Sequence, residues 1–179
     1  MFCVSVVLCW VSGPGDTLES KFKIAYRVPI MNSAEARVAA KPSQRTYDTQ
    51  VRVRYAETDQ MGVVYHANYA IWFEVGRIEM LRQLGAAYKE MEAEGCRLAV
   101  VELRCRYRLP ACYDDLITIR TRVQLVRQGL VRFAYQALRA EDGQLLAEGE
   151  TAHMPLDRYG KRSRLPEKYL KVLRAACGE

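Results

Sequence analysis

The sequence predicts an α+β domain in which a curled antiparallel sheet of about five strands wraps around one long central helix. Several long segments alternate apolar and polar residues with a period of two, which is the pattern of half-buried strands. A single segment carries bulky apolar residues at three- and four-residue spacing, which is the pattern of a helix. Turn residues separate the later strands at regular intervals, as in an antiparallel meander. Long strands of this kind curl, and a curled sheet can enclose a single helix.

The first elements alternate strand, turn and helix. Residues 49–55 alternate apolar and polar side chains and predict a strand. Gly62 marks the turn that follows it. Residues 68–84 then predict the long helix, which carries bulky apolar groups over much of its circumference and should be largely buried. Gly85 ends this helix, and residues 87–94 predict a short polar helix.

The rest of the chain predicts the remaining strands and one more helix. Four strands are expected at 98–107, 117–125, 131–137 and 144–154. A short helix over 167–175 closes the chain. We therefore predict a domain over 46–171, a C-terminal tail over 172–179, and an N-terminal extension over 1–45 that is disordered or partly non-native. Met31 is an alternative start within that extension.

Composition limits the classes of function. The 179 residues suit one domain, half of them are apolar, and the net charge of +6 is mild. This charge suits an anionic substrate that carries phosphates, but a solvated basic surface explains it equally well. The arginines alternate along strands instead of clustering with aromatic residues, so nucleic acid is not an expected partner.

The cysteines and the apolar start bear on the compartment. The six cysteines include no Cys-x-x-Cys pair, and two histidines are too few for a typical zinc finger, so no metal site is expected. Scattered free thiols indicate a reducing cytoplasm. The apolar run over 2–11 is too short to span a membrane and lacks the features of a signal peptide.

The segment from Tyr55 to Arg77 carries the most informative chemistry. It places Asp59, Gly62, His66 and Asn68 between a strand and the long helix. Backbone N–H groups are unpaired at the start of a helix. An acid beside such donors can perform acyl transfer, because the acid handles water while the donors hold the oxyanion.

The motif resembles that of hotdog-fold thioesterases of the 4-hydroxybenzoyl-CoA thioesterase family, and most closely the acyl-CoA thioesterase branch associated with the Tol–Pal cluster. The resemblance covers roughly 46–171. The positions that match the family motif are Tyr55, Thr58, Asp59, Gly62, Val64, Tyr65, His66, Asn68, Tyr69, Trp72, Phe73, Glu74 and Arg77. Glu57 stands where the family commonly has Asp. The resemblance implies hydrolysis of an acyl-CoA or aroyl-CoA thioester without a cofactor, coenzyme A arriving only as part of the substrate.

The resemblance also implies two catalytic residues. Asp59 would activate water or attack the thioester carbonyl itself, and the sequence leaves both open. Its spacing alone would instead favour a helix cap or an Asx turn. His66 would offer its backbone N–H to the thioester oxygen, and its imidazole would help to orient the acid or the water.

Other residues of the motif have a substrate-binding and a structural interpretation. Gly62 allows a positive φ and close approach of substrate. Asn68 is expected to cap the helix rather than to touch substrate. Tyr55, Val64 and Tyr65 are expected to line the site, although core packing explains the tyrosines nearly as well.

Charged residues outside the acid turn have mainly structural interpretations. Glu74 and Arg77 are expected to form an ion pair along the helix. His153 is expected to be a satisfied residue of the last strand. Four basic residues could meet the phosphates of coenzyme A, or could simply be solvated charges. They are Arg127, Lys161, Arg162 and Arg164.

Competing functions use the same fold. They are hydrolysis of acyl-carrier-protein thioesters at the same site, a non-catalytic acyl-binding role that would not need Asp59, and a dehydratase that would need a different arrangement of His and carboxylate. Open strand edges favour a homodimer or a tetramer. The resemblance implies that the active site then forms between subunits.

Overall fold

The computed structural model describes residues 45–178. The predicted extension therefore lies outside the described residues except for Arg45. The strands are β1 (Tyr47–Arg52), β2 (Arg97–Tyr107), β3 (Leu116–Arg127), β4 (Leu130–Arg139) and β5 (Leu145–Leu156). The helices are the one-turn η2 (Tyr55–Glu57), α1 (Asn68–Gln83), α2 (Tyr88–Ala93) and α3 (Glu167–Cys177).

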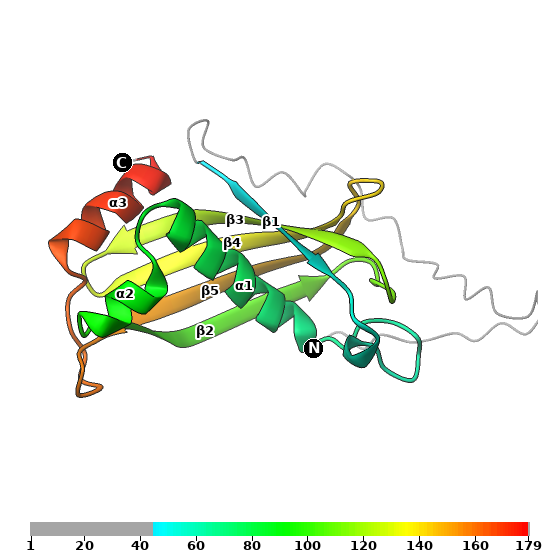
Figure 1. The fold of residues 1–179 in the computed structure, drawn as a ribbon, viewed down its shortest axis with the longest axis horizontal. Helices are drawn as coiled ribbons and strands as arrows, with labels where there is room; N and C mark the ends of the chain where they lie inside the picture. The colour runs from blue at the N-terminus through cyan, green and yellow to red at the C-terminus, as the bar shows by residue number, and fades with distance from the viewer. Residues whose placement is uncertain (1–44, 179) are drawn as a thin grey trace, which may run out of the picture. The chain divides into compact units, whose positions relative to one another are not determined.

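The five strands form one antiparallel sheet in the order β1-β3-β4-β5-β2, and α1 lies across one face of it (Figure 1). This confirms the predicted α+β class, the strand count and the long helix. β1 and β2 are the two edge strands. The register of β2 against β5 shifts between Val100 and Glu102, so Val101 is left without a partner across the ladder.

Helix α1 sits unusually close to the sheet at two points. A side chain at Gly149 of β5 would overlap the ring of Phe73 on α1. A side chain at Gly76 of α1 would overlap Ile119 of β3. Phe73 also stacks on Tyr135, with ring centroids 4.7 Å apart. A glycine on the helix or on the sheet thus makes room for a large side chain of the other element, and the core is packed around these two contacts.

Two element boundaries differ from the sequence prediction. The first strand ends at Arg52 instead of Tyr55, because Val53 leaves the ladder and its N–H donates to the carbonyl of Asp115 (3.0 Å). Tyr55 therefore begins the η2 turn. At the other end α3 continues to Cys177, two residues beyond the predicted helix, so most of the segment assigned to a C-terminal tail belongs to this helix. Leu173, at this end of α3, is fully buried.

No helix within residues 45–178 combines the length and the apolar character that crossing a membrane requires.

Candidate active site

The acid-bearing segment folds as a small hairpin immediately before α1. Thr58 and Val64 bridge its two arms, and the N–H of Tyr65 donates to the carbonyl of Glu57 (2.9 Å). At the tip, the N–H of Asp59 donates to the carbonyl of Val63 (2.9 Å). Asp59 therefore stands at the tip of the hairpin, and α1 begins just beyond its base.

Gly62 closes the tip with φ +75°. Its N–H donates to the carbonyl of Asp59 (3.0 Å), and the positive φ is the one that a short hairpin loop needs before its second arm. A side chain built at Gly62 would meet nothing within 4 Å. Within one subunit the glycine is thus required by the backbone conformation and not by crowding.

Asp59 has one oxygen engaged and one free. Its Oδ1 accepts a hydrogen bond from the N–H of Met61 (2.8 Å), which is the Asx turn that the spacing allowed. Among residues 45–178, no donor reaches Oδ2 and no cation pairs with the carboxylate. The turn fixes the direction of the side chain and leaves the second oxygen open to water or substrate.

Free donors lie at the start of α1. Among the hydrogen bonds of the described chain, the N–H groups of His66 and Ala67 have no acceptor. Ala67 is the N-cap and makes no side-chain cap, so the positive end of the helix is left uncompensated. The carbonyl of His66 accepts a hydrogen bond from the hydroxyl of Tyr107 (2.9 Å), at the end of β2. This bond fixes the peptide groups around His66. No hydrogen bond joins His66 to Asp59 within residues 45–178.

The expected capping role of Asn68 is wrong. Asn68 is the first residue of α1 rather than its cap, because Ala67 already has helical φ and ψ. Its side-chain Nδ2 instead donates to the carbonyl of Glu57 (2.8 Å). Asn68 therefore ties the base of the hairpin to the helix.

Glu57 is a supporting residue that the sequence reasoning missed. Its carboxylate is buried and accepts hydrogen bonds from the N–H of Arg54 (2.8 Å), the side chain of Arg54 (2.9 Å) and Nε1 of Trp72 (3.2 Å). Burial alone would raise the pKa of this carboxyl, but these donors lower it below its ordinary value. Glu57 takes the acidic position of a capping box at the start of η2, but Arg54 replaces the Ser or Thr of the usual signature, so the local sequence carried no clear signal.

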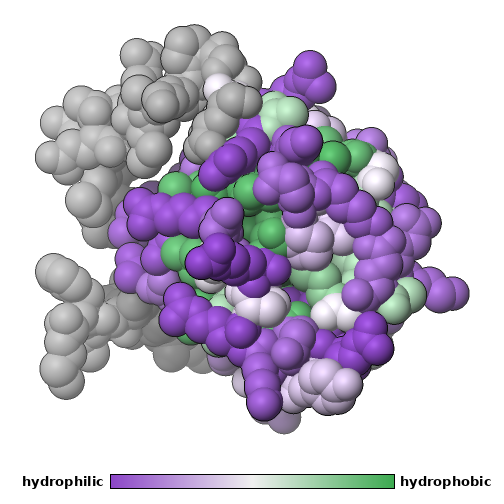
Figure 2. Space-filling view, turned by 90° about the vertical axis from the view of Figure 1, so that its left-hand side faces the viewer, coloured by the Kyte–Doolittle hydropathy of each residue, from purple (hydrophilic) through white to green (hydrophobic). Residues whose placement is uncertain are grey.

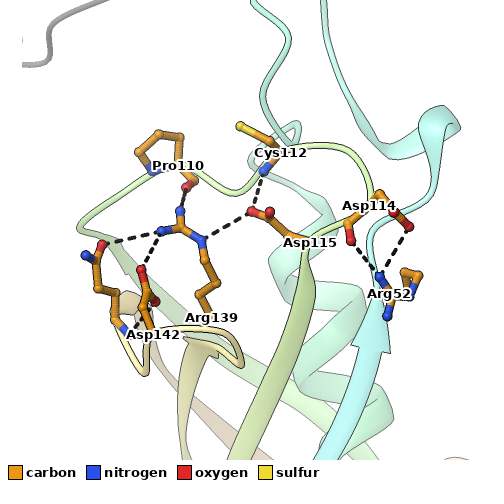
Figure 3. Close-up of polar contacts among 8 residues, drawn as sticks. Arg52, Pro110, Cys112, Asp114, Asp115, Arg139 and Asp142 are labelled. Carbon is orange, nitrogen blue, oxygen red and sulfur yellow. Dashed lines mark hydrogen bonds and ion pairs between the residues drawn. The ribbon is translucent and has the colours of Figure 1, made fainter.

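A second polar network holds the loop against which the hairpin packs (Figure 3). The N–H of Val64 donates to the carbonyl of Ala111 (2.8 Å) in this loop. Asp115 accepts from the N–H of Cys112 (2.8 Å) and pairs with Arg139 (3.5 Å), whose guanidinium also donates to the carbonyl of Pro110 (3.0 Å). The hairpin is thus anchored both to α1 and to the start of β3.

The other residues expected to line the site divide into two groups. Tyr55 and Tyr65 are exposed, at 78% and 48%. The ring of Tyr65 lies 4.3 Å from that of His66, beside the free donors. Val64 is only 6% exposed and belongs to the core, so in the single subunit it packs and does not line a site.

The predicted ion pair between Glu74 and Arg77 is wrong. Arg77 is only 5% exposed, and within residues 45–178 no carboxylate lies at ion-pair distance from it. Its guanidinium instead lies over the ring of Tyr88, 5.3 Å from the centroid. His153 is fully buried in β5 and bonds Thr151 through Nε2 (2.8 Å), so its role is structural as expected. Its Nδ1 has no hydrogen-bond partner among residues 45–178, so the predicted satisfied histidine is satisfied at one nitrogen only.

The basic residues considered for phosphate binding lie far from Asp59 in the same chain. Arg127 ends β3, whereas the hairpin packs beside the start of that strand. A strand of this length separates the two ends by ~36 Å. Arg162 lies beside the β3–β4 turn, near Gly129. Figure 2 shows the end of the domain that carries α3, and hydrophilic side chains cover most of it. In a single chain these cations are therefore solvated surface charges.

Metal ligands do not gather in the described part of the chain. No group of three or more His, Cys, Asp or Glu residues there has the arrangement of a metal site.

Comparison with known proteins identifies the family. A model described as the thioesterase-like superfamily matches residues 53–173. The chain belongs to the thioesterase-like superfamily. Among curated superfamily relatives, the acyl-CoA thioester hydrolase YbgC of Escherichia coli is 36% identical over 107 residues, which are 60% of this chain and 79% of that protein.

Solved structures of thioesterase-like proteins have the same fold. A DHNA-CoA thioesterase from Staphylococcus aureus superposes with a TM-score of 0.68 at 32% identity, over 74% of this chain and 89% of that one. A hypothetical protein from Thermus thermophilus gives a TM-score of 0.70 at 37% identity, over 74% and 98% of the two chains. These matches confirm the predicted hotdog fold and the predicted reaction class, hydrolysis of a thioester.

Proposed function

We propose that this protein hydrolyses acyl-CoA or aroyl-CoA thioesters, with the carboxylate of Asp59 as general base or nucleophile and the start of α1 as the oxyanion site. The observation that supports this most directly is the free oxygen of Asp59, held by a turn on a hairpin that leads directly into unpaired N–H donors. The names of relatives support the substrate class, since YbgC is an acyl-CoA thioester hydrolase and a structural neighbour acts on DHNA-CoA.

The reaction follows from these groups. The thioester oxygen accepts hydrogen bonds from the N–H groups of His66 and Ala67, which stabilise the negative charge that develops on it. Asp59 either takes a proton from the attacking water or attacks the carbonyl itself and forms an anhydride that water then opens. In both routes the C–S bond breaks, coenzyme A leaves as the thiol, and the acid is released. In the first route the proton taken by Asp59 passes to the departing sulfur, and in the second the thiolate takes a proton from water. Neither of these routes uses a metal, so we expect activity to survive dialysis against EDTA.

The substitution Asp59→Asn tests the assignment. The amide keeps an oxygen for the N–H of Met61 and so preserves the turn, but it can neither accept a proton nor attack. We expect kcat to fall by about 10²–10⁴ with an unchanged Tm. Asp114→Asn is the matched control, because Asp114 is an exposed acid of the neighbouring loop that pairs with Arg52 (3.3 Å), and it should retain full kcat. A folded Asp59→Asn variant with normal kcat would reduce Asp59 to a turn residue.

The competing carrier-protein activity is separated by a substrate panel. Acyl-CoA and acyl-carrier-protein thioesters with the same acyl group should differ in kcat/KM, with the CoA thioester preferred. A higher kcat/KM for the carrier-protein thioester would make that thioester the proposed substrate.

We also place the reaction in the cytoplasm, because the thiols of Cys96, Cys105 and Cys112 form no disulfide.

Activity is proposed to require a homodimer, or a tetramer built from dimers, formed through the edge strand β2. Val100, Val101 and Leu103 on this edge are 44–54% exposed, and Ile71 of α1 beside them is 52% exposed. An open edge with apolar side chains favours pairing with a second copy. We expect Val101→Lys to weaken the dimer in sedimentation, while Gln50→Lys on the opposite edge strand leaves it intact. A fully active monomer would refute this assembly.

A further inference from the structure

A cavity of about 180 Å³ lies between α1 and the edge of the sheet that β2 forms. Its wall combines apolar residues with polar ones. The apolar residues are Ala70, Ile71, Val100 and Leu103, and the polar residues are Glu74, Arg77, Tyr135, Thr151 and His153. An engineered apolar cavity of ~150 Å³ accommodates benzene, so this one can take the end of an organic substrate.

Arg77 brings a buried positive charge to the cavity, and no carboxylate among residues 45–178 forms an ion pair with it. The residue is 5% exposed, and its Nη1 is buried with no hydrogen-bond partner in the described chain. The nearest carboxylate on the cavity wall is Glu74, whose side chain is exposed and makes no ion pair with it. The ring of Tyr88 offsets part of the charge, because a cation over an aromatic face is attracted to it. Water in the cavity can hydrate the guanidinium, but it supplies no opposite charge.

The remaining polar groups of the wall are neutral near pH 7. The hydroxyls of Tyr135 and Thr151 are hydrogen-bonded (2.7 Å), and Thr151 also bonds Nε2 of His153 (2.8 Å). Burial raises the pKa of Tyr135 to about 12. Burial and the nearby charge of Arg77 lower the pKa of His153 to about 4. Among residues 45–178, Arg77 is therefore the only buried charge facing the cavity.

We propose that this cavity binds the far end of the acyl group, and that Arg77 selects acyl groups ending in a carboxylate. A guanidinium pairs with a carboxylate through two parallel N–H···O bonds. The attraction between the two charges is stronger in a buried site than in water. The apolar part of the wall suits the methylene chain that precedes the carboxylate. The proposal rests on the thioesterase activity proposed above and names the substrate class of that site.

The test compares substrates of equal chain length that differ only at the far end. Suberoyl-CoA ends in a carboxylate where octanoyl-CoA ends in a methyl group. For the whole, assembled protein we expect kcat/KM to favour suberoyl-CoA by about 10- to 100-fold, the range for a hydrogen bond to a charged group. Arg77→Met keeps a long side chain but removes the charge, and it should abolish or reverse this preference. Arg82→Met is the control, because Arg82 is an exposed residue of α1 that pairs with Glu79, and it should leave the preference unchanged.

The Tm of the Arg77→Met variant distinguishes a role of Arg77 in substrate selection from a role in the fold. If Arg77 serves a ligand, removing an unpaired buried charge should leave Tm unchanged or raise it. If Arg77 supports the fold, Tm should fall, which would overturn the proposal. Free suberate should raise the Tm of the unmodified protein more than octanoate does, and the Arg77→Met variant should lose this difference.

Each outcome is decisive. Hydrolysis of both CoA thioesters with no preference for suberoyl-CoA overturns the role of Arg77 and leaves the thioesterase proposal intact. The absence of all hydrolysis, together with a Tm shift from suberate that depends on Arg77, overturns the reaction but supports the carboxylate site. An Arg77→Met variant that fails to fold counts as the structural role and overturns the proposal.

Discussion

Removing the side chain of Glu57 should destabilise the protein and misplace Asp59. In Glu57→Ala the buried indole N–H of Trp72 loses its acceptor, at a cost of about 1–3 kcal/mol for an unsatisfied buried donor. The N–H of Arg54 loses a hydrogen bond worth about 1 kcal/mol. The guanidinium of Arg54 is 73% exposed and returns to water, so the ion pair adds little. The free energy of unfolding should therefore fall by about 2–4 kcal/mol.

The loss of activity should accompany the loss of stability. The carbonyl of Glu57 accepts from the N–H of Tyr65 and from Asn68, so the residue joins both arms of the hairpin to α1. When its side chain is released, Asp59 loses its fixed position relative to the free N–H donors of α1, and kcat should fall by about tenfold or more even where the variant is fully folded.

Urea unfolding at pH 7 and kcat at saturating acyl-CoA measure the two effects. The control is Glu79→Ala, which removes an exposed ion pair of α1 and should cost at most about 0.5 kcal/mol. A double-mutant cycle between Glu57→Ala and Trp72→Phe should show coupling of about 1 kcal/mol, because the two side chains share a hydrogen bond. A Glu57→Ala variant as stable and as active as the unmodified protein would refute the supporting role.

Three further predictions test other parts of the structure. His66→Ala should lower kcat less than Asp59→Asn does, because alanine keeps the backbone N–H; a larger loss would make the imidazole itself catalytic. The pKa of His153 is about 4 in the folded protein, below its ordinary 6.5. As pH falls, the imidazole of His153 is therefore protonated in the unfolded chain before it is protonated in the folded protein. Between pH 7 and 5 the free energy of unfolding, measured with urea, should fall by about 2 kcal/mol. His153→Gln should remove this fall. If the free energy of unfolding of the variant still falls between pH 7 and 5, groups other than His153 cause the effect. Gly149→Ala should destabilise the fold by about 1–3 kcal/mol, because its methyl group overlaps Phe73. Gly129→Ala, which meets only the end of Arg162 at 3.6 Å, should be tolerated, and equal Tm values for the two variants would contradict the packing.

Local patterns predicted most of the fold but few of the contacts around the acid. The strands and α1 follow from periodicities of two and of three to four residues, which are properties of neighbouring positions. The hairpin that carries Asp59 is different, since its second arm is held by Ala111, far along the chain. No pattern within the motif encodes that hydrogen bond.

Asn68 and Arg77 show why local rules failed at the site. An asparagine before an apolar helix is a good cap, but the turn before it makes Ala67 helical and moves Asn68 inside the helix. Glu74 and Arg77 have the spacing of an ion pair, yet the sheet buries Arg77 and leaves Glu74 exposed. In both cases the surroundings of the helix, and not the helix itself, decide what the side chain contacts.

The close contacts of α1 with the sheet have a mechanical consequence. Phe73 enters a gap in β5 at Gly149, and Ile119 of β3 enters a gap in α1 at Gly76. The two elements interlock in both directions, so the helix cannot slide along the sheet or roll on it without a steric clash. The N–H groups at the start of α1 are therefore carried on a rigid support and form the stationary half of the proposed site.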